Sequence, residues 1–212
     1  FTRITTYTST DGTTGATDTG VTAASTAQAI SLTGVVAETL TFCTGTSITG
    51  TNCGSVAGST IDFGSFSSST ASTGTSVMAA STNGDSGYGI TVNGATLTSG
   101  GDTITALTSP TASSAGSEQF GLNLMDNTTP NVGADVNPTP NGTTLRGQPS
   151  TDYDTADVFK FVTGNQVAAS DNGGAGGTNA QTFTVGSLVN FGGATEAGTY
   201  TATMTYICTA TF

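Results

Sequence analysis

Apolar and polar residues alternate along much of this chain, most clearly from Gly198 to Phe212. Every second residue there is apolar or small, and the residues between them are almost all Thr. A period of two over this length is typical of a β-strand with one buried face. We therefore expect a long last strand whose apolar face carries Tyr200, Met204, Tyr206 and Phe212.

The same period recurs in shorter runs upstream. Residues 28–42 alternate through Ile30, Leu32 and Val36, and residues 88–92 alternate through Tyr88 and Ile90. No segment keeps apolar residues at helical spacing for three turns. The abundance of Thr, with Gly and Asn between the runs, favours strands joined by turns. The pattern predicts an all-β fold, a two-sheet sandwich of jelly-roll or Greek-key type.

Two connections have their own signatures. Asn93-Gly94 is a strong hairpin signal, so we expect residues 88–92 and 95–98 to pair across it. Residues 126–156 hold four of the five prolines and few apolar side chains. That stretch is predicted to be a long surface loop, in which Arg146 would be the accessible site for trypsin.

The N-terminal part differs from the rest. Residues 1–10 are predicted to be one extended arm with Phe1, Ile4 and Tyr7 as apolar anchors. Residues 11–26 contain a single large apolar residue and have the composition of a flexible linker. The sandwich body is expected over residues 27–212. An arm on a tether is suited to joining the sheet of another molecule.

Charge and composition exclude several classes of function. Three basic residues against fourteen acidic ones give a net charge of -11, which argues against binding nucleic acid or anionic membranes. No apolar run is long enough for a membrane span. His is absent, which removes Ser-His-Asp triads, Cys-His dyads and His-based zinc sites. A glycosidase needs only two carboxylates, but its usual aromatic platforms are scarce without Trp, so we expect no enzyme.

The chain begins at Phe1, which favours a mature secreted product, with a piece cut from a longer chain as the alternative. Cys43 and Cys53 flank a short Gly/Thr loop, and we expect them to form a disulfide that leaves Cys208 reduced. From the sequence alone, bridges from Cys208 to Cys43 or Cys53 remain open, as do three free thiols.

Two further kinds of site are suggested by local motifs. Asp152, Asp154 and Asp157 could bind calcium through carboxylate oxygens, although an acidic surface loop has the same composition. No other cofactor is expected. Asn127 and Asn141 begin Asn-x-Thr sequons and are candidates for glycosylation in a secretory pathway with the enzyme.

The arm, the linker and the alternating last strand, which ends Thr211-Phe212, together resemble donor-strand pilins and fibre subunits of bacterial and archaeal surfaces. The resemblance implies an extracellular cell-surface filament, a homopolymer assembled head to tail by strand donation from the N-terminal arm, for adhesion or biofilm. The alternatives are a secreted binding module, either a carbohydrate-binding or an adhesin domain, and a surface-lattice protein.

Overall fold

The computed structural model describes residues 1–170 and 176–211, which form β-strands and one short 3-10 helix, η1 (Cys53–Ser55), but no α-helix. The predicted all-β class is confirmed. The chain divides into two compact units, Phe1–Ala37 and Glu38–Phe212, here called the N-terminal unit and the body. None of the described helical turns is long and apolar enough to cross a membrane.

The body contains two main antiparallel sheets. The first has the order β12 (Ala134–Asn137), β16 (Thr178–Asn190), β4 (Ser72–Thr82), β3 (Leu40–Gly45), and β9 (Gln119–Asn123) also pairs with β16. The second has the order β13 (Gly147–Pro149), β15 (Gln166–Ser170), β5 (Tyr88–Gly94), β17 (Met204–Ala210). Shorter pairs are β6 (Thr98–Ser99) with β7 (Asp102–Thr103), β8 (Thr111–Ala112) with β14 (Val158–Phe159), and β10 (Asn127–Thr128) with β11 (Asn131–Val132).

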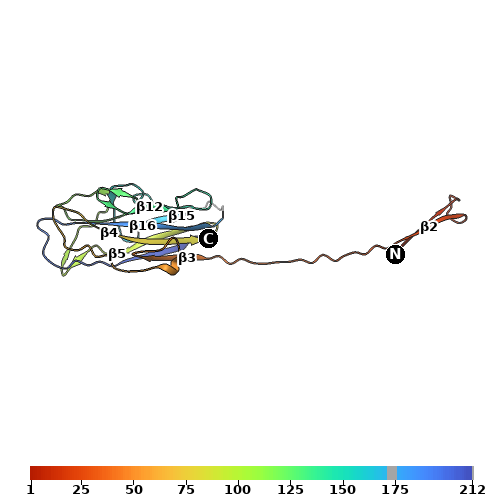
Figure 1. Ribbon diagram of the computed structural model, residues 1–212, viewed down its shortest axis with the longest axis horizontal. Helices are drawn as coiled ribbons and strands as arrows, with labels where there is room; N and C mark the ends of the chain where they lie inside the picture. Colours follow the sequence, from red (N-terminus) through yellow and green to blue (C-terminus); the bar gives the residue numbers. More distant parts are fainter. Residues whose placement is uncertain (171–175, 212) are drawn as a thin grey trace. The chain divides into compact units, whose positions relative to one another are not determined.

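The core lies between the two main sheets. Alternate residues of each long strand point into it: Met78 and Ala80 from β4, Phe183 and Val185 from β16, Ile90 and Val92 from β5, and Val167 from β15. The long strands run side by side along the body (Figure 1). The alternation of apolar and polar residues in these strands therefore arises as expected, because one face of each strand packs in the apolar layer between the sheets.

The expected hairpin at Asn93-Gly94 does not form. β5 pairs instead with β15 on one side and β17 on the other, both distant in sequence. The nearby hairpin joins β6 to β7 across Gly100 and Gly101. A central strand with two long-range partners gains more packing than a local turn provides, so tertiary pairing overrides the turn signal.

Residues 126–156 are not a simple surface loop. They contain β10 to β13, and Val132 packs with Phe159 and Leu188 in a second apolar cluster. Strand β16 passes close to this segment, since a Cβ added to Gly186 would lie 3.3 Å from Cγ1 of Val132. The segment therefore covers apolar surface, which its low content of apolar residues did not indicate.

Arg146, expected to be the accessible trypsin site, is buried in this segment. Lys160 is shielded as well, with only 13% of its side chain exposed and an ion pair to Asp152 at 2.8 Å. Arg3 is fully exposed in the N-terminal unit. Limited trypsin digestion of the native subunit should therefore cut after Arg3 and spare the body, as mass spectrometry of the fragments will show. An early cut after Arg146 would contradict this burial.

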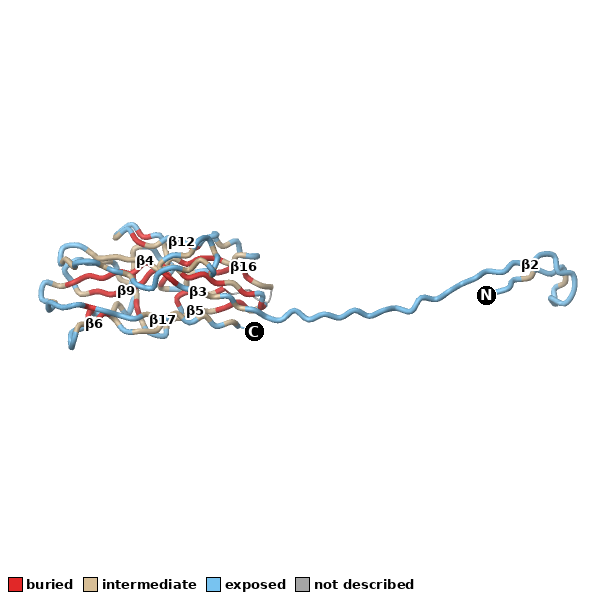
Figure 2. The backbone as a smooth tube through the Cα atoms, turned by 60° about the horizontal axis from the view of Figure 1, so that its bottom comes forward, coloured by how far each residue is buried: buried red, intermediate tan, exposed pale blue. Residues whose placement is uncertain are grey.

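The N-terminal unit contains a hairpin of β1 (Thr2–Tyr7) and β2 (Ala16–Thr22). The flexible linker expected over residues 11–26 is thus wrong in its middle, because β2 lies inside it. Thr-rich β2 pairs with β1 through the backbone, which needs few apolar side chains. Figure 2 shows this unit exposed almost throughout, in contrast with the buried strands of the body.

Candidate functional site

The body has one open side, where both main sheets end. β3 is the last strand of the first sheet and β17 the last of the second, and the two lie next to each other. Among the described residues, β17 pairs with β5 alone, apart from an isolated bridge just before it. Apolar side chains there are only half-buried against the core: Leu40, Phe42, Met204, Tyr206 and Cys208.

A cleft of about 480 Å³ opens along this side. Its apolar lining includes Ile61, Phe63, Leu97, Tyr200, Met204 and Tyr206. A cavity of about 150 Å³ holds a benzene molecule, so this cleft has room for several aliphatic side chains. We call it the edge cleft. A sandwich that lacks one strand would have an apolar core open at one edge, as this body has.

The edge cleft lies toward one end of the body. Its rim includes Thr44, Gly45 and Met204, at the last residues of β3 and the first of β17. The opposite end carries the first residue of β3, because Leu40 pairs with Thr82 next to the turn that joins β4 to β5. The body thus begins at the end opposite the cleft.

That starting point is well fixed. The N–H of Thr39 donates to Oδ1 of Asn83 at 2.6 Å, and Oγ1 of Thr82 donates to the carbonyl of Thr39 at 2.9 Å. Any segment that precedes Thr39 is therefore attached firmly at a defined corner of the sandwich.

The residues just before this corner have the pattern of a strand but no partner strand. Ile30, Leu32 and Val36 share one face of an extended segment, yet their exposed fractions are 84%, 91% and 87%. In the described part of the chain, residues 23–36 enter no strand pair. Burying three such side chains is worth about 1.5–3 kcal/mol each, so the isolated subunit forgoes a large stabilisation.

This segment was assigned by sequence to the start of the body, over residues 27–212, whereas the structure places it in the N-terminal unit. The signal was present in the alternation of residues 28–36. What no pattern could show is that β3 begins only at Leu40 and leaves that alternation unpaired.

The predicted anchors Phe1, Ile4 and Tyr7 are exposed and do not share one face of the strand. Ile4 lies opposite Gly20, and Tyr7 lies opposite Ala16 beyond a register shift. Along a strand, Ile4 faces the side opposite to Phe1 and Tyr7, since successive side chains alternate. Thr2–Tyr7 is also already paired with β2. The arm is therefore not a free strand with one apolar face.

The predicted face of the last strand is only partly correct. Met204 and Tyr206 do point toward the core from β17. Tyr200 precedes that strand, and its ring contacts Phe191 edge to face while its hydroxyl donates to the carbonyl of Glu196 at 3.0 Å. Phe212 lies outside the described residues. The strand is thus shorter than its alternation predicted.

The disulfide between Cys43 and Cys53 is confirmed, and Cys208 is a free thiol. The bridge joins β3 to η1 across a sequence separation of 10 residues. In the chain-entropy model a loop of this size contributes about 2.5–3 kcal/mol. Disulfides of this kind are typical of proteins outside the reducing cytosol.

Burial raises the pKa of the Cys208 thiol to about 12. Only the thiolate reacts with iodoacetamide, so alkylation should rise about tenfold per pH unit from pH 7 to 10 without levelling off. Glutathione measured in parallel should level off near the ordinary thiol pKa of about 8.5. A plateau for Cys208 near pH 9, followed by mass spectrometry, would show that its surroundings do not raise the pKa of the thiol.

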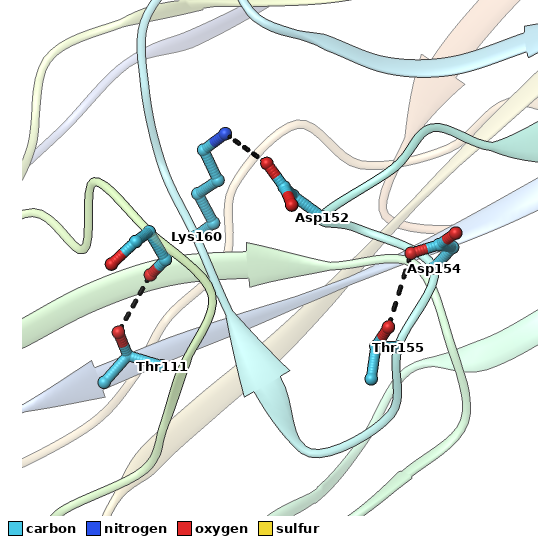
Figure 3. A network of polar contacts seen from close by, with 6 residues as sticks. Thr111, Asp152, Asp154, Thr155 and Lys160 are labelled. Carbon is cyan, nitrogen blue, oxygen red and sulfur yellow. Dashed lines mark hydrogen bonds and ion pairs between the residues drawn. The ribbon is translucent and has the colours of Figure 1, made fainter.

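The three predicted calcium ligands do not come together. Asp152 binds Lys160, while Asp154 lies apart beside Thr155 (Figure 3). Asp157 accepts hydrogen bonds from the N–H groups of Thr129 and Thr128, both at 2.7 Å, which hold the pKa of its carboxyl below the ordinary value. Over residues 1–170 and 176–211, no group of three acidic, His or Cys side chains is arranged for a metal ion.

The two sequons differ sharply. Asn127 is fully buried, and its Nδ2 donates to Oδ1 of Asn123 and to the carbonyls of Met125 and Val132. Asn141 is exposed on a loop, where its Oδ1 accepts from the Thr143 N–H at 2.9 Å. Of the two, only Asn141 is accessible to a glycosyltransferase in the folded protein.

The edge cleft and the unpaired segment are thus the features of this molecule that call for a functional explanation. One is an apolar core left open at the end of two sheets, and the other is an apolar strand left in solvent. Comparison of the chain with protein-family models, with curated protein sequences and with solved structures finds no match.

Proposed function

We propose that the chain is a structural subunit of an extracellular filament, joined head to tail to copies of itself by β-strand donation from the N-terminal unit. The observation that carries the proposal is that one chain contains both an apolar segment without a partner strand and a sandwich whose core is open at one edge. In the described part of the isolated subunit, Ile30, Leu32 and Val36 have no apolar surface to pack against. The edge cleft leaves apolar side chains of the body open to solvent.

The position of the two features supports an open chain of subunits. The body begins at one end, next to Thr82, and the edge cleft opens toward the other, beside Gly45 and Met204. Two different surfaces at opposite ends make a heterologous contact, which repeats without closing into a pair. The low content of charge and the Thr-rich surface suit a fibre used for adhesion or biofilm.

The proposal is tested by assembly of the purified full-length chain. Negative-stain microscopy and sedimentation should show filaments for residues 1–212 and monomers for residues 38–212. The shorter chain should still fold, because no residue of the N-terminal unit belongs to the core. A full-length chain that stays monomeric at high concentration and on its native cell surface would overturn the proposal and favour a surface binding module.

A further inference from the structure

We infer that the donated strand is residues 28–36, and that it adds antiparallel to the free edge of β17 in the next copy, with its C-terminal end at the edge cleft. The inference rests on the proposed function and identifies the donor strand and the acceptor strand of the contact between subunits. It differs from the arm of residues 1–10 that the sequence suggested, and from donation by the hairpin.

The donor assignment follows from which faces are apolar. Ile30, Leu32 and Val36 lie on one face and only Val35 on the other, so one edge can bury three of the four large apolar residues. β1 and β2 instead satisfy each other's backbone groups on one side, and their large apolar residues are divided between two faces. Residues 30–36 number seven, as does β17, so the two segments match in length.

The direction follows from the topology of the body. Val36 lies close to Glu38, where its own body begins, so in a head-to-tail contact it stays at the mouth of the neighbour's cleft. Met204, the first residue of β17, lines that cleft. Leu32 and Ile30 then lie beyond the cleft, along the same edge toward Ala210. The donor therefore runs opposite to β17, in the pairing that hydrogen-bonds slightly better.

The side chains select one register. With Val36 opposite Met204, Gly34 lies opposite Tyr206 and Leu32 opposite Cys208. Each pair then combines a small residue with a larger one, and the only glycine on the donor face meets the bulkiest side chain of β17. A shift by two residues would place Leu32 against Tyr206 and leave Gly34 beside Met204, a poorer match of volumes.

This register makes the native thiol a reporter. Residues directly opposite in an antiparallel pair have Cβ atoms about 4.5–5.5 Å apart, close to what a disulfide requires. Leu32→Cys in the full-length chain should therefore link to Cys208 of the neighbour when assembled protein is oxidised with copper phenanthroline at pH 9 to 10, because the Cys208 thiol ionises only at high pH. The linked chains should form a ladder of covalent multimers on a non-reducing gel. The link should join peptides containing residues 32 and 208 in mass spectrometry.

Two matched variants serve as controls. Ser31→Cys places the thiol on the outward face of the same strand and should give on the order of tenfold less multimer. Leu32→Cys combined with Cys208→Ser should give no ladder. Deleting residues 1–22 should leave filament formation intact, because the hairpin is not the donor.

The outcomes separate this inference from the proposed function. Filaments that form without any link between residues 32 and 208, or that need residues 1–22, overturn the donor assignment while the proposed function stands. A link within a single chain, giving a cross-linked monomer, shows that the strand folds back and also overturns it. Absence of filaments from the unmodified chain would contradict the proposed function itself.

Discussion

Leu32→Asp in the full-length chain should abolish filament formation and leave the melting temperature of the body unchanged. Leu32 is 91% exposed in the isolated subunit, so its replacement removes no packing there. In a filament the change would remove the burial of one Leu and place a carboxylate beside Cys208, on the half-buried apolar face of β17. A loss of about 4 kcal/mol would weaken each contact on the order of a thousandfold.

Ser31→Asp is the matched control, because it adds the same charge one residue away on the face that stays in solvent. Sedimentation and microscopy should show normal filaments for this variant. Normal filaments from Leu32→Asp at the same protein concentration would mean that the apolar face of residues 28–36 is not buried on assembly.

Asn127→Ala should lower the free energy of unfolding by about 3 kcal/mol, because it leaves buried polar groups unsatisfied. The Oδ1 of Asn127 accepts the N–H of Asp157 at 2.7 Å, and its Nδ2 serves the carbonyls of Met125 and Val132, both at 2.8 Å. Thermal unfolding in a chain of this size should shift down by roughly 6–12 °C.

Asn141→Ala is the comparison in the other sequon. Its oxygen also accepts several hydrogen bonds, but the loop is exposed and water replaces them, so the loss should be about 1 kcal/mol or less. Equal effects of the two substitutions on chemical denaturation would show that Asn127 does not hold the segment of residues 126–156 in place.

That segment illustrates where prediction from sequence failed. It was read as a surface loop because apolar residues are sparse, yet Asn123 binds the carbonyls of Thr155 and Val158 at 2.8 and 2.7 Å. Buried amides can anchor a loop as apolar side chains do, provided that each finds its partners. Those partners lie about thirty residues away in sequence, so no local pattern announces them.

The sequence by itself determined the class of fold and the faces of the alternating strands, and it favoured the pairing of Cys43 with Cys53 without excluding the others. Alternation fixes which residues of a strand are buried, because side chains alternate between faces whatever the partners are. The ten-residue spacing of the two cysteines likewise favours a local bridge.

Only the tertiary structure decided which strands are paired and which are left over. Both residues 28–36 and residues 204–210 have the pattern of half-buried strands, but β17 pairs with β5, whereas residues 28–36 enter no strand pair in the described chain. Backbone hydrogen bonds in a sheet carry no side-chain signature, so partner choice depends on long-range packing. The edge cleft likewise depends on long-range pairing, because β3 and β17 are the last strands of their sheets and have no further strand beside them in the described chain.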